Sequence, residues 1–416
     1  MRKSFVQKVA NSFTRNKASR TAAEVSAGSS ASAAEFSQST HFAATSRNLR
    51  EVSVRLDDYL ERTDLGGSEV DLDVISMSRQ IEKVRKYTNG SLPDSLEPQP
   101  LSEKELEFIK LAAWNAKAVY ASDTAHIQHI AELDEFSIYQ STHSEEIDAS
   151  FRDGTVKATR VQLFSTRKEE TPSLLLVVAI RGSTSKRRDW TINFDEIGQG
   201  TEGDGFINTN ECKYDIHGGF LECAKKMVEK VSDAISSILS KAHVEDSNKD
   251  IQLLFTGHSA GGAVASLLYA HMMSKNSSSL ANLSSRFTSI DCIVFGSPPV
   301  TKPALDTYGQ NSTFFSIINE GDPVPRIDKD YVESLLIIYI SPMPNTGAGW
   351  DLPQMALDNA GRILFLKVSV QGLCAVPDDI GQNETKRVLE TTIFGNPRAH
   401  KMNVYLWKLG LVNGLF

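Results

Sequence analysis

The stretch Ile251-Gln252-Leu253-Leu254-Phe255-Thr256-Gly257-His258-Ser259-Ala260-Gly261-Gly262-Ala263 decides how this chain folds. It begins as an apolar run of strand length, passes through a Gly-x-Ser-x-Gly turn, and continues into a small-residue helix predicted over 263–270. The two outer glycines leave room for a sharp turn in which Ser259 takes a strained conformation and exposes its hydroxyl above the sheet. We therefore predict a nucleophile elbow, with Gly257, His258 and Gly261 framing a nucleophilic Ser259.

Strand-like and helix-like segments alternate along residues 101–416, which predicts an α/β fold with a mostly parallel central sheet flanked by helices. Alternating polarity predicts a half-buried strand over 156–168. Short apolar runs predict strands buried on both faces. They cover 174–180, 251–255, 290–295, 314–318 and 363–370. A strand that leads through such an elbow into a helix resembles the nucleophile turn of the α/β-hydrolase fold.

The N-terminal quarter has a different composition. Residues 1–47 are first basic and then rich in alanine and serine, so we expect them to be disordered. Residues 48–100 are interpreted as a helical extension and linker, with helical periodicity over 74–84. Ser102 and Glu105 form a predicted capping box for a helix that continues to Val119. We place the start of the catalytic domain, 101–416, near Leu101.

Composition narrows the possible partners. A formal net charge of −8 argues against nucleic acid as a partner. The longest apolar run, 174–180, is far shorter than the ~20 residues that span a bilayer. The four cysteines lack metal-ligand spacing, so we expect no metal and no cofactor, and interpret them as reduced thiols, with one or two disulfides as the alternative.

Residues 1–20 carry six basic residues and no acidic one. They lack the apolar core of a secretory signal. The pattern fits a mitochondrial transit peptide, a basic amphipathic segment on an anionic membrane surface, or a disordered basic tail. We expect an intracellular protein, cytoplasmic in the first instance, with mitochondrial or membrane-peripheral placement as alternatives.

A serine nucleophile needs a base, and chain order restricts the choice of histidine. In α/β-hydrolases the acid and then the histidine follow the serine. Only His271 and His400 follow Ser259. His271 lies twelve residues further on in the predicted helix, which is about 18 Å along its axis at ~1.5 Å per residue. His400 is therefore the predicted base by elimination.

The acid should follow a strand that comes after the nucleophile. Asp322 comes just past the predicted strand over 314–318, with Gly321 to turn the chain and Pro323 to stiffen its exit. Glu320 is the nearest rival. Asp291 lies at the wrong end of its strand, and Asp328 and Asp330 fall in a charged loop.

An oxyanion hole requires two N–H donors. One is predicted at Ala260, which follows the nucleophile at the helix start. The second is predicted at Ser183, because the buried strand over 174–180 leads into the small, polar loop Gly182-Ser183-Thr184-Ser185.

Taken together, these segments resemble the class 3 (fungal-type) lipases of the α/β-hydrolase superfamily. The matching segments occur in the family's order between about residues 105 and 410: Ile180-Arg181-Gly182-Ser183 with Asp189-Trp190 and Asn193; Ile216-His217-Gly218-Gly219-Phe220; Gly257-His258-Ser259-Ala260-Gly261-Gly262-Ala263; Phe295-Gly296-Ser297-Pro298-Pro299-Val300; Asn319-Glu320-Gly321-Asp322-Pro323-Val324-Pro325; and His400 with Tyr405. The resemblance implies the same triad of Ser259, Asp322 and His400, and gives His217 a structural role near the site.

The resemblance implies an enzyme that hydrolyses carboxylic esters of lipids through an acyl-enzyme, with acylglycerols or phospholipids as substrates. The segment after Ser183 lacks an amphipathic lid helix, and family members usually carry another residue where this chain has Pro299. Small esters therefore stay open as substrates. The alternatives are a catalytically silent, lipase-like scaffold or lipid-sensing protein, and a serine peptidase.

Overall fold

One large sheet with parallel strands at its centre positions the segments that follow the strands Ile251–His258 and Phe314–Asn319. The computed structural model describes residues 72–120, 139–147, 158–166, 173–182, 200–202, 205–207, 213–244, 250–274, 277–306, 312–368, 372–377 and 382–412. Ser183, Cys212, the predicted disordered segment 1–47 and the proposed membrane contact of residues 1–20 lie outside this part of the chain.

Within the described residues, nine strands form this sheet in the order β1-β12-β11-β10-β8-β7-β4-β3-β2. The middle strands are parallel: β4 (Leu174–Ile180), β7 (Ile251–His258), β8 (Ser289–Phe295), β10 (Phe314–Asn319) and β11 (Arg362–Leu366). Antiparallel strands extend both edges: β2 (Tyr139–Ile147) and β3 (Thr159–Thr166) on one side, β12 (Cys374–Ala375) and β1 (Glu97–Pro98) on the other. The predicted α/β fold with a mostly parallel central sheet is confirmed.

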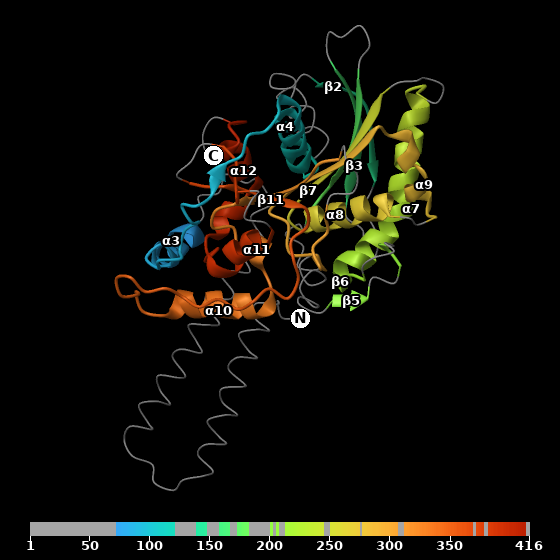
Figure 1. The fold of residues 1–416 in the computed structure, drawn as a ribbon. Helices are drawn as coiled ribbons and strands as arrows, with labels where there is room; N and C mark the ends of the chain where they lie inside the picture. Colours follow the sequence, from blue (N-terminus) through green and yellow to red (C-terminus); the bar gives the residue numbers. More distant parts are fainter. Residues whose placement is uncertain are drawn as a thin grey trace, which may run out of the picture.

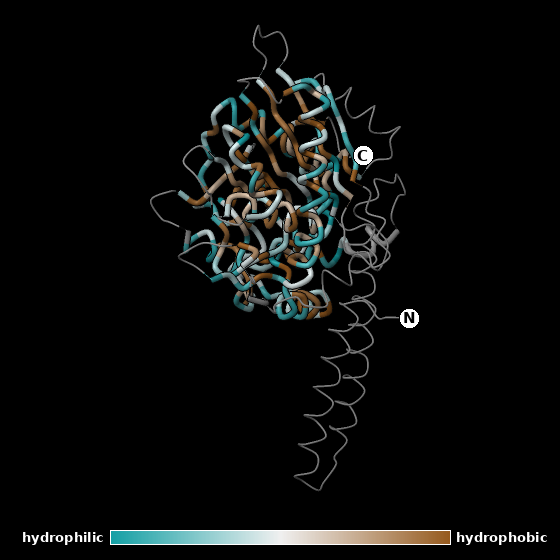
Figure 2. Tube along the Cα trace, turned by 90° about the vertical axis from the view of Figure 1, so that its right-hand side faces the viewer, coloured by the Kyte–Doolittle hydropathy of each residue, from teal (hydrophilic) through white to brown (hydrophobic). Residues whose placement is uncertain are grey.

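Helices cover both faces of the sheet (Figure 1). α7 (Gly218–Lys241), α8 (Ala260–Met273) and the short α9 (Ser279–Asn282) lie on one face. α4 (Glu103–Ala118) and α12 (Met402–Lys408) lie on the other. Successive strand residues point to opposite faces, so Leu176 and Val178 pack with α7 and α8 whereas Leu175 and Val177 pack with α4. Figure 2 shows hydrophobic chain concentrated in the interior.

The remaining elements complete the molecule beside the sheet. α3 (Leu72–Val84), α10 (Lys329–Ile340) and α11 (Gln382–Thr391) lie near the β11 side of the sheet (Figure 1). A smaller sheet joins β5 (Gly200–Glu202), β6 (Asp215–His217) and β9 (Thr301–Lys302).

None of the described helices is both long and apolar enough to cross a membrane. The described cysteines, Cys223, Cys292 and Cys374, are buried and form no disulfide with one another.

The helix α8 is buried all round, as expected for a helix in the middle of a layered domain. Small residues fill its first turns, and Leu267 and Leu268 follow. Both leucines are fully buried, each contributing about 1.5–3 kcal/mol through burial. Small residues in the first turn let the helix approach the sheet closely. The start of α8 is therefore fixed at the end of β7, where Ser259 lies.

Sequence and structure differ most at the β2–β3 edge. β2 is a polar strand, Tyr-Gln-Ser-Thr-His-Ser-Glu-Glu-Ile, that the apolar pattern did not predict. β3 is buried along its whole length, whereas its alternation predicted one exposed face. Its second face is covered because Phe164 packs against Phe108 of α4 and Tyr139 of β2.

The segment before the predicted domain start packs on the same core. Val84, Tyr87, Leu92 and Leu96 are buried in one cluster with residues of α10, α11 and β11. β1 pairs with β12, at the edge of the large sheet. The boundary near Leu101 stays a prediction, and the structure shows that residues 81–98 contribute to the packing of the larger unit.

Lys83 fastens this segment to α10. Its Nζ donates to the carbonyl oxygens of Ile338 (3.3 Å), Tyr339 (2.8 Å) and Ser341, at the C-terminal end of α10. A cation at this end also interacts favourably with the helix dipole.

We predict that Lys83→Met lowers the free energy of unfolding by about 1–3 kcal/mol, because charge-assisted hydrogen bonds to the end of α10 are lost. Urea unfolding of the full chain measures this change. Lys86→Met, which alters an exposed lysine one turn away, is the control and should change stability by less than about 0.5 kcal/mol. Equal losses in both variants would contradict the capping role.

Candidate functional site

The turn between β7 and α8 holds Ser259 in a left-handed conformation, with φ 58° and ψ −136°. A Cβ on Gly257 would lie 2.5 Å from the carbonyl carbon of Gly261, and a Cβ on Gly261 would overlap the carbonyl oxygen of Ile180. Only glycine fits at these two positions. The close approach of β4, β7 and α8 thus gives the elbow its sharp bend, as the sequence pattern predicted.

Ser259, His400 and Asp322 come together in one buried line of hydrogen bonds. The Oγ of Ser259 lies 3.0 Å from Nε2 of His400. Nδ1 of His400 lies 3.0 and 3.1 Å from the two carboxylate oxygens of Asp322. His400 and Asp322 are fully buried and Ser259 is nearly so. The arrangement leaves Nε2 of His400 free to accept a proton from Ser259 when Nδ1 carries the hydrogen directed at Asp322.

Two further donors hold the Asp322 carboxylate. The backbone N–H of Val324 donates to Oδ1 at 2.9 Å, and the hydroxyl of Tyr405 donates to Oδ2 at 2.6 Å. Burial, together with the nearby negative charge of Asp322, raises the pKa of Tyr405 well above its usual value. The Tyr405 hydroxyl therefore stays protonated and remains a donor to the carboxylate.

Glu320, the rival acid, has a different set of partners. Oε1 accepts from the backbone N–H of Leu92 at 2.9 Å, and Oε2 accepts from that of Val368 at 2.6 Å. Both oxygens are used to join backbone segments on either side of the strand end. Asp322 is the acid whose carboxylate meets His400.

The other histidines that drew attention in the sequence have structural partners. His271 lies in the last turn of α8, where Nδ1 bonds the carbonyl oxygen of Phe206 (2.7 Å) and Nε2 bonds Oγ of Ser278 (2.8 Å). The ring of His217 accepts from the N–H of Phe220 at 3.4 Å, capping α7. Neither residue reaches Ser259.

Ala260, the first predicted oxyanion donor, is the first residue of α8. Its N–H belongs to the first turn, whose donors have no acceptor within the helix. Ser183, the second predicted donor, lies outside the described residues. Gly182, which precedes it, lies against the nucleophile, because a Cβ on Gly182 would be 3.2 Å from Cβ of Ser259.

Tyr120 is a site neighbour that sequence reasoning missed. Its hydroxyl accepts from the N–H of Gly182 at 3.0 Å and lies 3.3 Å from Nδ1 of His258. Tyr120 comes directly after α4, far from the elbow in sequence, and no motif near it signals this contact.

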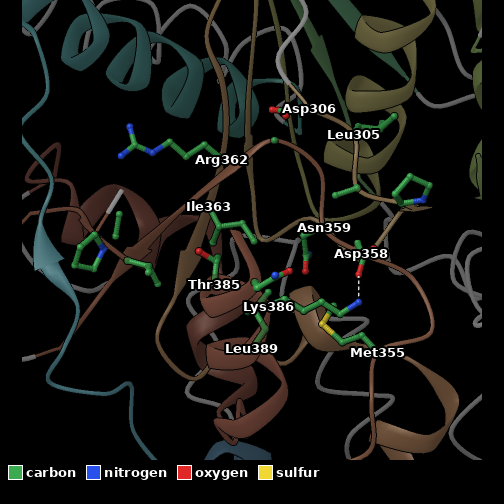
Figure 3. Close-up of a pocket in the computed structure, with 17 residues that line it drawn as sticks. Leu305, Asp306, Met355, Asp358, Asn359, Arg362, Ile363, Thr385, Lys386 and Leu389 are labelled. Carbon is green, nitrogen blue, oxygen red and sulfur yellow. Dashed lines mark hydrogen bonds and ion pairs between the residues drawn. The ribbon is translucent and has the colours of Figure 1, made fainter. Parts of the chain in front are cut away.

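A separate pocket of about 570 Å³ lies between the β9 region, β11 and α11 (Figure 3). Its charged groups have protein partners: Lys386 pairs with Asp358 at 2.7 Å, and Arg362 donates to Gln99 at 2.8 Å. No member of the Ser259–His400–Asp322 line borders it. Among the described residues, no cluster of His, Cys, Asp and Glu is arranged to hold a metal ion.

Comparisons with known proteins point to one family. Residues 177–331 match the family described as lipase (class 3). A curated relative, secreted mono- and diacylglycerol lipase 1 of Fusarium solani, is 26% identical over 188 residues, which cover 44% of this chain and 48% of the relative. The matched region thus spans about half the length of that relative.

Solved structures with a similar backbone fold include two fungal lipases. The lipase of Rhizopus microsporus var. chinensis is 16% identical, with a TM-score of 0.40 and coverage of 74% of this chain and 92% of that one. Lip2 lipase of Yarrowia lipolytica is 13% identical, with a TM-score of 0.40 and coverage of 73% and 95%.

Gly296 offers a sharp test of how tightly the Ser259–His400–Asp322 line is packed. A Cβ there would lie 2.7 Å from Oδ2 of Asp322, 2.9 Å from the hydroxyl of Tyr405 and 3.1 Å from Nδ1 of His400, and φ is +52°. We predict that Gly296→Ala slows the reaction of Ser259 with a fluorophosphonate by about 100-fold, the effect of roughly 1 Å of misplacement.

Gly372→Ala is the matched control, because that glycine also has positive φ (+99°) but has nothing within 4 Å of a Cβ. It should keep the wild-type labelling rate. A Gly296→Ala protein that remains folded and labels as fast as the control would show that the three groups tolerate displacement.

Proposed function

We propose that this chain, whose residues 177–331 match the lipase (class 3) family, hydrolyses carboxylic esters of lipids with Ser259 as nucleophile, His400 as base and Asp322 as orienting acid. The observation that carries the proposal is the continuous line from Ser259 Oγ to His400 Nε2 and from His400 Nδ1 to Asp322, buried throughout.

The proposed reaction follows from these contacts. Ser259 Oγ attacks the ester carbonyl while His400 Nε2 takes its proton, and the carbonyl oxygen becomes an oxyanion. The N–H of Ala260 is the proposed first donor to that oxyanion, and the N–H of Ser183 the proposed second. His400 then returns the proton to the departing alcohol. Water, with His400 again as base, hydrolyses the acyl-enzyme and regenerates Ser259.

Asp322 contributes by fixing the imidazole. Its carboxylate accepts the Nδ1–H of His400, which leaves Nε2 as the basic nitrogen facing Ser259, and it stabilises the imidazolium that forms during attack. The bonds from Tyr405 and Val324 keep the carboxylate oriented within the buried site.

For the substrate we propose mono- and diacylglycerols. The curated relative with this activity in its name supports that choice. Phospholipids and small esters are the competing substrates. Parallel rate measurements on a monoacylglycerol, a diacylglycerol and a phosphatidylcholine of the same acyl length distinguish them, and faster release from the phospholipid would overturn the choice.

We predict that Ser259→Ala lowers kcat by roughly 10⁴-fold or more and abolishes covalent labelling by a fluorophosphonate. Ester hydrolysis and intact-mass analysis measure the two effects. Ser266→Ala, which removes another buried serine from α8, is the control and should retain both activities. Wild-type protein that neither labels nor hydrolyses any of these esters would favour the silent, lipid-sensing scaffold.

A further inference from the structure

Three hydrogen bonds connect the backbone of Gly182 to the backbone of His400 through two side chains. Gly182 N–H donates to the Tyr120 hydroxyl at 3.0 Å. The Tyr120 hydroxyl lies 3.3 Å from Nδ1 of His258, and Nε2 of His258 lies 2.7 Å from the carbonyl oxygen of His400. This series of hydrogen bonds passes next to Ser259, because His258 immediately precedes the nucleophile.

The direction of each bond follows from its acceptors. A carbonyl oxygen cannot donate, so Nε2 of His258 carries a hydrogen and gives it to His400. Burial, and then the nearby His400, lower the pKa of His258 well below its ordinary value, so the ring is neutral and Nδ1 is an acceptor. The Tyr120 hydroxyl therefore donates to Nδ1 while it accepts from Gly182.

The two ends of this series of hydrogen bonds, Gly182 and His400, lie in different parts of the proposed catalytic site. Gly182 directly precedes the predicted oxyanion donor Ser183. His258 directly precedes the nucleophile, and its final bond holds the backbone of the base. β4 and β7 are paired in the large sheet as far as Ile180 and Gly257, whereas the turn Pro397–His400 belongs to none of the strands of that sheet.

Tyr120 is fixed from its own side. It follows the end of α4, where the carbonyl oxygen of Ala118 accepts from the buried guanidinium of Arg160 at 3.0 Å. Arg160 lies in β3 and also pairs with Glu146 of β2. Earlier in the same helix, the carbonyl oxygen of Ala112 accepts from Oγ1 of Thr256 in β7 at 3.2 Å. Tyr120 thus has a defined position relative to the sheet.

The rings of His258 and His400 also pack together, with centroids 4.5 Å apart and planes inclined by 31°. His400 becomes positively charged when it takes the proton from Ser259. A second positive charge at this distance would oppose that step, so a neutral ring suits the position.

We propose that His258 is a positioning residue that, with Tyr120, sets the distances between the nucleophile, the base and the backbone of Gly182. This inference rests on the proposed function. A neutral side chain with a donor at Nε2 and an acceptor at Nδ1 is what the position requires, which an aliphatic residue of similar size cannot supply.

The test compares His258→Leu, His258→Gln and Tyr120→Phe with wild type, using the rate of fluorophosphonate labelling together with kcat and KM. We expect His258→Leu to lower the labelling rate and kcat by about 10- to 100-fold with KM nearly unchanged. Glutamine, whose amide can still donate to the His400 carbonyl, should recover most of the loss. Tyr120→Phe should cost about tenfold, and the double variant should be no slower than His258→Leu alone.

Two controls separate positioning from stability. His271→Leu removes another buried histidine with two bonded nitrogens, and Tyr339→Phe removes a buried hydroxyl bonded to the carbonyl of Gly395. Both should lower thermal stability with kcat within about twofold of wild type. If His258→Leu does not fold, the labelling rate of Tyr120→Phe is compared with that of Tyr339→Phe, and only a slower Tyr120→Phe supports the positioning role.

The outcomes distinguish this inference from the proposed function. Wild-type protein that does not label at Ser259 contradicts the function itself. The positioning role alone is overturned if the wild-type protein labels at Ser259 and His258→Leu labels no more slowly than His271→Leu. It is also overturned if His258→Gln labels no faster than His258→Leu.

Discussion

The left-handed backbone of Ser259 is the constraint on which the rest of the site depends. Such a conformation costs of the order of 1–3 kcal/mol for a residue other than glycine. It persists because the Ser259 N–H donates to the carbonyl oxygen of Phe295 at 3.0 Å, while its own carbonyl accepts from Gly262 at 2.9 Å. Neighbouring strand and helix therefore both hold the strained residue, and the hydroxyl is directed out of the sheet toward His400.

Burial of the site imposes a second demand, which the surrounding residues meet by hydrogen bonding. An ionised carboxylate away from water is unstable unless donors surround it. Asp322 receives bonds from His400, Val324 and Tyr405, so its burial is compensated on both oxygens. The following loop is fixed by Arg326, which is fully buried, pairs with Asp328 at 2.8 Å and donates to the carbonyl oxygen of Leu389. The acid is thus held by the packing of the region that follows it.

Much of the fold could be predicted from sequence, for identifiable reasons. β4, β7, β8 and β10 are buried on both faces, so each appears as a continuous apolar run. The capping box at Ser102 is also present, with its reciprocal Ser102–Glu105 bonds. β2 escaped prediction because it is an edge strand whose polar residues face solvent, and its partner β3 is buried by contacts from distant elements.

The candidate site divides in the same way. Ser259, Asp322 and His400 could be chosen because their order along the chain is restricted, and Glu320 was separated from Asp322 only by its bonds to Leu92 and Val368. His258 had been assigned to the elbow without a further role. Its link to Tyr120 joins residues 138 positions apart, and spacing within a motif carries no information about such a contact.

The bonds from Leu92 to Glu320 and from Lys83 to the end of α10 have a kinetic consequence. Their partners are separated by 228 and more than 250 residues, and Ser259 meets His400 across 141. Closing loops of this length costs conformational entropy before the stabilising contacts can form, so folds rich in distant contacts form slowly. The reacting groups can therefore assemble only late in folding, after the central strands have associated, so a partly folded chain would contain the elbow without its base.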